Sequence, residues 1–239
     1  MSSRAELLAQ RTDWMRQGTQ RFQRELDALK DADFGAPSAL EGWSRSHVVA
    51  HVVGNARALV NLMTWARTGV ETRMYADAAQ RAAEIESGAT LAPERLRLEF
   101  EQSRLELDDA FAAMPGEAWG AEVITAQGRK VEATFVPWMR SREVWVHAVD
   151  IGPTASFEEF PSAFVEALID ESSTMFSGRD DCPSVTIEYD GRRRQLGAAG
   201  GPTVTGPPSA VLAWLLGRSR DGLATADGPT AIPQLPRWL

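Results

Sequence analysis

The chain has 239 residues, of which 44% are hydrophobic and 24% are charged, which is typical of a globular protein and excludes disordered and fibrous classes. Its net charge of −8 disfavours non-specific binding to nucleic acid or to an acidic membrane surface, because both are negatively charged and attract positively charged proteins. The single cysteine, Cys182, cannot form an internal disulfide, and the charged N-terminal segment lacks the apolar stretch of a signal peptide. We therefore expect a cytoplasmic protein that binds neither nucleic acid nor membranes. We also expect a monomer.

The first part of the chain has the apolar periodicity of long amphipathic helices. Each of four stretches is bounded by a capping residue, a proline or a glycine. The predicted helices cover residues 5–30, then 46–68 with Ser44 or Ser46 as the cap, then the stretch between Pro93 and Pro115, and finally 137–150. Four such helices predict an antiparallel bundle, whose core is a common place for a metal site. Between the last two helices, residues 118–136 predict an irregular loop or a hairpin around Gln127-Gly128.

The pattern changes after residue 152. A helix is predicted over 161–177, and Asp190-Gly191 is a strong hairpin signal between strands at 185–189 and 192–196. A further strand near 202–205, a short helix over 207–216 and a proline-rich extended tail follow. We therefore predict an α+β protein with a helical domain over 1–152 and a smaller α/β domain over 153–239.

The chain has three histidines, and their spacing suggests a metal site. His47 and His51 lie four residues apart on one predicted helix, and Glu143 and His147 lie four apart on another, so each pair shares a helix face. If the two faces meet, a His–Glu–His set would occupy three corners of a tetrahedron and leave the fourth open, as in catalytic zinc sites. Spacing cannot choose between His47 and His51, and Glu-x-x-x-His on a helix can also be a simple side-chain pair.

Longer motifs around these residues resemble the mycothiol-dependent maleylpyruvate isomerases, a branch of the DinB-like metal-binding bundles. The similarity covers residues 39–75, 118–133 and 138–152, and it extends to 215–223 and 236–239 near the end of the chain. It implies a DinB-like four-helix bundle with a smaller C-terminal α/β domain. It also implies that zinc is bound by His51, Glu143 and His147, and that His47 has a structural or supporting role. The C-terminal domain of the family supplies an active-site arginine, which matches Arg218.

The resemblance implies cis–trans isomerisation of maleylpyruvate to fumarylpyruvate in gentisate degradation. The double bond of the substrate cannot rotate until a nucleophile adds to it, and a thiolate both adds readily and leaves again. Cys182 is a poor candidate for this thiol, because it lies beside Pro183 and far in sequence from the predicted metal ligands. The family uses mycothiol, and zinc can convert a thiol to the thiolate.

The implied substrate is a dicarboxylate, so an acidic protein needs local cations to bind it. Arg218 is the first choice, because a guanidinium can bind a carboxylate through two parallel hydrogen bonds and can stabilise the charge that forms on addition. Weaker candidates are Arg140, Arg142 and Arg220, and the run at 192–194 resembles a solvated strand edge. On this interpretation catalysis depends on Arg218 and on the zinc ligand His51.

Three other functions remain open from the sequence. A mycothiol S-transferase would have a nearly identical site but would consume the thiol. A non-catalytic metal- or ligand-binding module would leave maleylpyruvate unchanged. A zinc hydrolase is disfavoured, because the chain lacks the His-Glu-x-x-His arrangement that places a general base beside the metal.

Overall fold

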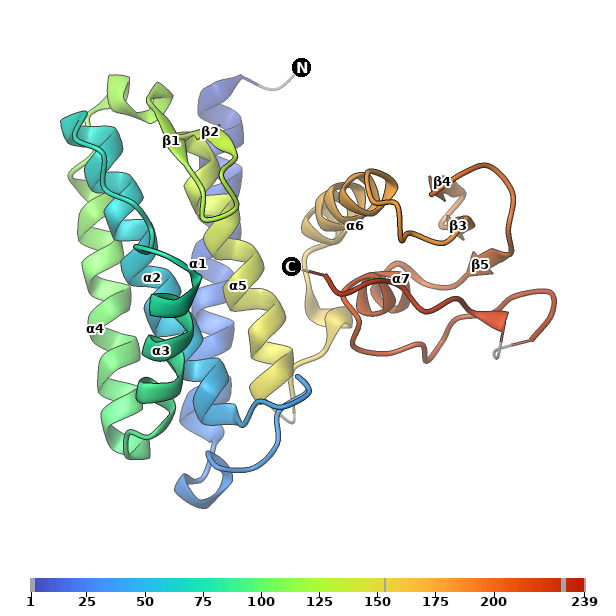
Figure 1. Cartoon of the computed structure of the whole chain (residues 1–239), viewed down its shortest axis with the longest axis horizontal. Helices are drawn as coiled ribbons and strands as arrows, with labels where there is room; N and C mark the ends of the chain where they lie inside the picture. The colour runs from blue at the N-terminus through green and yellow to red at the C-terminus, as the bar shows by residue number, and fades with distance from the viewer. Residues whose placement is uncertain (1–2, 153, 229–230, 239) are drawn as a thin grey trace. The chain divides into compact units, whose positions relative to one another are not determined.

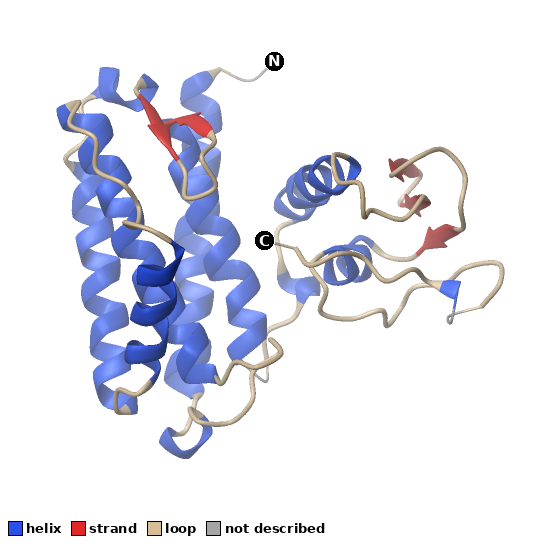
Figure 2. Ribbon diagram, viewed as in Figure 1, coloured by secondary structure: helices blue, strands red, loops and turns tan. Residues whose placement is uncertain are grey.

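The computed structural model describes residues 3–152, 154–228 and 231–238 (Figure 1). The chain divides into two compact units, Met1–Ala155 and Ser156–Leu239. The first unit is dominated by long helices, and the second combines helices with a small sheet (Figure 2). The predicted α+β class is therefore confirmed. Within the described ranges, every helix is too short or too polar to cross a membrane.

Four long helices form the frame of the N-terminal unit and lie side by side in Figure 1. α1 packs most extensively against α5, and α2 packs against both α4 and α5. In the core, Phe22 of α1 stacks on Phe100 of α4 with ring centroids 5.0 Å apart. The long helices are α1 (Arg4–Ala28), α2 (Arg45–Thr68), α4 (Pro93–Ala112) and α5 (Val136–Ile151).

Local sequence signals explain where α2 begins and ends. Ser44 is the N-cap, and its side chain accepts a hydrogen bond from the backbone of His47 while the His47 side chain accepts one from the backbone of Ser44. Ser46, the other predicted cap, instead donates from its hydroxyl to the carbonyl of Phe34. Gly69 ends the helix in the left-handed region, at φ 74°.

A glycine allows α1 to approach α5 closely. A Cβ atom at Gly18 would lie 2.6 Å from Cδ1 of Trp145, so a larger residue could not occupy this position without a shift. The Trp145 indole donates a hydrogen bond of 2.9 Å to the carbonyl of Trp14 on α1. These contacts fix the position of α5 against α1.

A fifth helix of this unit, α3 (Ala78–Ala89), was not predicted from the sequence. Its only buried residue is Ile85, so it lacks the apolar stripe by which the longer helices are detected. The helix lies along α2, where a Cβ atom on Gly88 would come within 2.8 Å of the Cβ of Ala50. The segment 118–136, predicted as a loop or hairpin, contains the antiparallel strands β1 (Glu122–Ile124) and β2 (Lys130–Glu132).

The C-terminal unit is built around a three-stranded sheet with the order β4-β3-β5. β3 is antiparallel to β4 and parallel to β5. The predicted hairpin turn is confirmed, because Asp190 and Gly191 both have positive φ, at 45° and 72°. The elements are α6 (Ser162–Ser177), β3 (Val185–Tyr189), β4 (Arg192–Leu196), β5 (Thr203–Thr205) and α7 (Pro208–Leu215).

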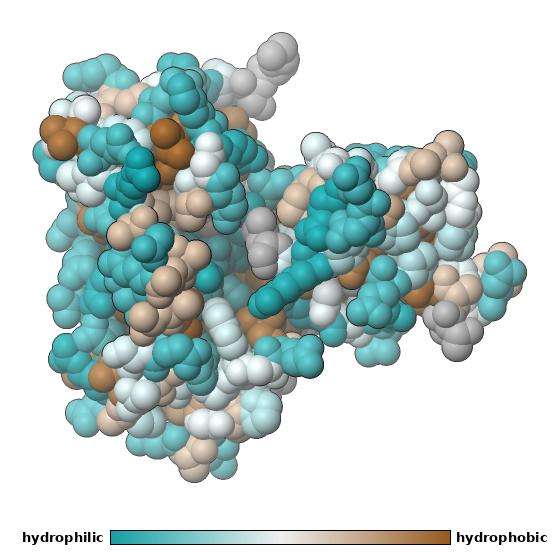
Figure 3. Space-filling model, in the orientation of Figure 1, coloured by the Kyte–Doolittle hydropathy of each residue, from teal (hydrophilic) through white to brown (hydrophobic). Residues whose placement is uncertain are grey.

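The surface of the N-terminal unit is mainly hydrophilic on the face shown in Figure 3, with hydrophobic residues scattered over it. Among the described residues, the exposed large hydrophobic side chains are Val70, Leu91, Leu98 and Leu105. Most apolar side chains of this unit are therefore used in packing the helices.

Candidate metal centre

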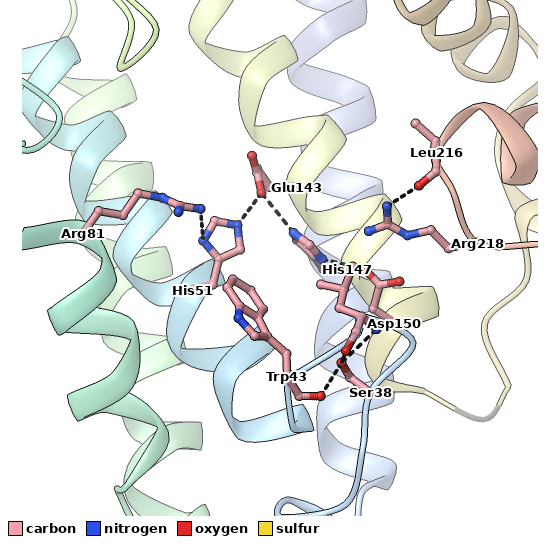
Figure 4. Close-up of polar contacts among 10 residues, drawn as sticks. Ser38, Trp43, His51, Arg81, Glu143, His147, Asp150, Leu216 and Arg218 are labelled. Atoms are coloured by element: carbon pink, nitrogen blue, oxygen red, sulfur yellow. Dashed lines mark hydrogen bonds and ion pairs between the residues drawn. The ribbon is translucent and has the colours of Figure 1, made fainter. Parts of the chain in front are cut away.

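Two histidines and a glutamate meet between α2 and α5 (Figure 4). The Nε2 atom of His51 lies 2.8 Å from Oε2 of Glu143, and Nε2 of His147 lies 3.2 Å from the same oxygen. One ligand atom from each residue lies within 4.8 Å of the others. The two imidazole rings pack edge to face with centroids 4.9 Å apart. The structure thus brings together the three side chains that the resemblance implies as metal ligands.

His47 lies four residues before His51 but has a different role. Its Nδ1 atom lies 2.7 Å from Oγ of Ser44 in the cap of α2, and its Nε2 atom lies 3.4 Å from a carboxylate oxygen of Glu86 on α3. The Trp43 ring stacks on the His47 ring and is tilted against the His51 ring. The four-residue spacing did not distinguish His47 from His51 as a candidate metal ligand. The structure distinguishes them, because His47 takes part in the cap of α2.

Asp150 supports His147 from the side opposite Glu143. Its Oδ2 atom lies 2.7 Å from Nδ1 of His147, and its side chain has no exposed surface. A carboxylate on one ring nitrogen leaves the other nitrogen for a metal, and such a partner usually fixes the orientation of a histidine ligand. The sequence analysis missed Asp150, although its position three residues after His147 on the same helix is a detectable signal.

The protonation states of the cluster follow from burial and from these contacts. Burial lowers the pKa of His51 below 6.5, against the opposing effect of Glu143. Burial also acts to lower the pKa of His147, but hydrogen bonds to Asp150 and Glu143 outweigh it, and the pKa is raised. Burial would raise the pKa of Glu143, but the two imidazoles hold it well below its usual value. These shifts favour a carboxylate at Glu143, a neutral imidazole at His51 and a protonated imidazole at His147.

Two further residues of the α2–α3 region border the cluster. Arg81 of α3 places Nη2 3.3 Å from Nδ1 of His51. Tyr75 precedes α3, and burial together with the charge of Glu143 raises the pKa of its hydroxyl to about 12, so the group stays neutral. Neither residue was predicted from the sequence, and for Arg81 the reason is that the helix that carries it has no apolar stripe.

Arg140 binds the two ligand-bearing helices together. Its side chain is almost fully buried, and its Nη1 atom donates to the carbonyl of Val52 at 2.7 Å and to Oδ1 of Asn55 at 2.9 Å. Burial lowers its pKa to about 10, so the guanidinium remains charged at neutral pH. Arg140 therefore links α5 to α2 beside His51. The sequence analysis named Arg140 as a weaker candidate for carboxylate binding, and these contacts give it a structural function.

The donor set fits a divalent ion such as zinc. Two imidazole nitrogens and one carboxylate oxygen are the ligand types found in catalytic zinc sites, which keep a further position for water or another ligand. The carboxylate of Asp150 behind His147 supplies the outer support that such sites usually have.

Arg218 lies in the C-terminal unit, just after α7. Its backbone N–H donates to the carbonyl of Ala213, and its Nη1 donates to the carbonyl of Leu216. Its guanidinium lies 5.8 Å from the ring centre of Trp238. The expected active-site role of Arg218 stays a prediction. Arg220 is exposed in the same segment.

Cys182 lies in the turn before β3, with its Sγ atom 3.5 Å from the carbonyl oxygen of Pro183. Burial raises the pKa of its thiol, which makes it a weak nucleophile at neutral pH. The nearby arginine run is engaged in ion pairs, in which Arg192, Arg193 and Arg194 bind Glu166, Glu188 and Asp170.

The fold and the cluster define a class of protein, a helical bundle with a candidate His–Glu–His metal site joined to a small α/β unit. Residues 15–152 match the family model of the mycothiol maleylpyruvate isomerase N-terminal domain. The whole chain is similar to a solved structure of the mycothiol-dependent maleylpyruvate isomerase, with 38% identity, full coverage of both chains and a TM-score of 0.94. The structure of a histidine-to-alanine mutant of that enzyme matches equally well. A search among curated proteins finds no match. This chain belongs to the mycothiol-dependent maleylpyruvate isomerase family.

Proposed function

We propose that the protein is a zinc- and mycothiol-dependent isomerase that converts maleylpyruvate to fumarylpyruvate in cytoplasmic gentisate degradation. The observation that carries this proposal is the convergence of His51, Glu143 and His147 within a chain that resembles such an isomerase over its whole length. The identities of the metal and of the substrate go beyond what family membership gives. The zinc content of the protein and the product of the reaction can each be measured.

The side chains of the cluster suit the task of holding a metal with one open position. His51, Glu143 and His147 would bind zinc, and Asp150 keeps the His147 ring oriented through its hydrogen bond. Bound zinc would lower the pKa of a thiol and hold it as the thiolate at neutral pH. Arg218 would bind a substrate carboxylate and stabilise the negative charge that develops when a nucleophile adds.

The state of Cys182 supports an external thiol. A thiol of raised pKa is mostly protonated at neutral pH, and Cys182 is the only cysteine in the chain. We therefore place the nucleophile for addition to the double bond on a cofactor thiol.

The test is an assay of purified, metal-analysed protein with maleylpyruvate, in the presence and absence of mycothiol. We expect conversion to fumarylpyruvate that requires both zinc and mycothiol, while the concentration of free thiol stays constant. Stoichiometric loss of thiol would identify the protein as a mycothiol S-transferase. Unchanged maleylpyruvate in the presence of zinc and mycothiol would contradict an isomerase and support a binding module.

A further inference from the structure

Arg81 is placed to act directly beside the cluster. It extends from the first turn of α3 toward His51, and it approaches the ring nitrogen on the opposite edge from Glu143 (Figure 4). The side chain is partly buried, and it also interacts with the hydroxyl of Tyr75. It is therefore a cation held against a candidate metal ligand within the N-terminal unit itself.

Two cavities of the N-terminal unit meet at this arginine. A cavity of about 640 Å³ runs between α2, α3 and the start of α4, and His51 lines it. A second cavity of about 310 Å³ lies between the segment before α3 and the β1–β2 turn. Arg81, Tyr75 and Met74 line both cavities. Arg81 therefore forms part of the wall of both cavities.

The other arginines of these cavities are neutralised by their own carboxylates. Arg57 contacts Glu99 and Glu106, and Arg73 lies 2.7 Å from Glu71. Among the described residues, the contacts of Arg81 are instead to a histidine and a tyrosine, neither of which is a carboxylate. Its positive charge is therefore not balanced by a direct ion pair.

Metal binding would make the contact between Arg81 and His51 unfavourable. In the metal-free cluster, Nε2 of His51 faces Glu143, and Nδ1 can accept a hydrogen bond from Arg81. A neutral imidazole that binds a metal through Nε2 carries its proton on Nδ1. The N–H of His51 would then face the guanidinium of Arg81, which has only donors. The guanidinium would therefore be stabilised by another hydrogen-bond acceptor nearby.

We propose that Arg81 binds a carboxylate of the substrate beside the metal-binding cluster. The inference rests on the proposed function for the identity of the substrate, a dicarboxylate whose two anionic ends each need a cation. Arg81 would supply one of these cations from α3, within the N-terminal unit. The planar guanidinium can bind a carboxylate through two parallel hydrogen bonds, which a lysine cannot reproduce.

The experiment compares the wild type with Arg81→Met, Arg81→Lys and the control Arg73→Met, all loaded with zinc. Arg73→Met removes the same charge from an exposed arginine that also lines the second cavity. Calorimetry without thiol measures the Kd of heptanedioate, a saturated dicarboxylate that cannot react. Steady-state kinetics measure KM separately for maleylpyruvate and for mycothiol, and metal analysis gives the zinc content.

We expect Arg81→Met to weaken heptanedioate binding and to raise KM for maleylpyruvate, each by about 10- to 100-fold, as for the loss of a hydrogen bond to a charged group. KM for mycothiol and zinc content should not change, Arg81→Lys should recover part of the loss, and Arg73→Met should resemble the wild type. Dicarboxylate affinity that is the same in Arg81→Met and the wild type at full zinc occupancy would overturn the inference, as would a wild type that does not bind heptanedioate.

The same data separate this inference from the proposed function. A wild type that isomerises maleylpyruvate while Arg81→Met is unaffected refutes only the role of Arg81. A wild type that does not isomerise but binds heptanedioate in an Arg81-dependent manner refutes the proposed reaction and supports the dicarboxylate site.

Discussion

The Nδ1 atom of His147 lies 2.7 Å from the carboxylate of Asp150, one turn further along α5. Because Asp150 is buried and His147 also contacts Glu143, two successive turns of α5 carry two candidate ligands and the group that orients one of them. We predict that Asp150→Ala weakens zinc binding by about 10- to 100-fold, the usual effect of removing such a partner. Competition with a chromogenic chelator measures this affinity. An unchanged zinc Kd would show that the contact does not support metal binding.

Replacing the ligands should abolish metal binding. We predict that His51→Ala or His147→Ala loses both zinc and isomerase activity, because each removes one of three donors. His47→Ala is the matched control, since it deletes an imidazole one turn from His51 whose contacts are to the cap of α2, to Glu86 and to Trp43. It should keep zinc and lose about 1 kcal/mol of stability in urea unfolding. Stoichiometric zinc in both ligand variants would rule out this ligand set.

Arg218 should matter for turnover and not for metal binding. We predict that Arg218→Ala folds, binds zinc normally and is nearly inactive, because the substrate carboxylate and the charge of the transition state lose their partner. Circular dichroism, metal analysis and the isomerase assay together test this. Arg220→Ala, which removes an exposed arginine two residues away, should be close to the wild type. Near-normal turnover of Arg218→Ala would give Arg218 a purely structural role.

The cysteine of the chain should be dispensable. We predict that Cys182→Ala retains its activity, because the raised pKa of the thiol leaves it protonated and the proposed nucleophile is external. The assay with saturating mycothiol measures the effect. An inactive Cys182→Ala protein of normal stability would argue against a mechanism that depends on a cofactor thiol.

Zinc affinity should fall as the pH is lowered. The pKa of His147 is raised above 6.5 in the metal-free protein, so zinc has to displace a proton at any pH below that raised value. Because zinc displaces one proton from His147, the apparent zinc affinity should decrease about tenfold for each unit by which the pH falls below that pKa. The stability of the metal-free protein has the opposite dependence. The stabilisation from protonated His147 is complete below pH 6.5 and is lost as the pH rises through its folded pKa.

Asp150→Ala provides a control for this pH dependence. Its hydrogen bond is among the causes that raise the pKa of His147, so its removal should move the loss of zinc affinity to lower pH. Zinc titrations at several pH values in both proteins measure the shift. Identical pH profiles would show that another group sets the dependence.

The sequence by itself determined the features that depend on neighbouring residues. Heptad-spaced apolar side chains predicted the long helices, and Asp190-Gly191 predicted a hairpin because both residues adopt positive φ in a tight turn. The i,i+4 spacing placed Glu143 and His147 on one face of a helix, and this is how they lie in α5. Such features follow from local backbone geometry, which does not require knowledge of distant parts of the chain.

Only the tertiary structure decided which distant groups meet. Spacing left His47 and His51 equivalent, and the capping of α2 together with its packing against α5 turns only His51 toward Glu143. Arg81 reaches the cluster from α3, a helix that leaves almost no apolar pattern in the sequence because it buries a single side chain. Contacts between segments far apart in the chain depend on how whole helices pack, and no local pattern encodes that packing.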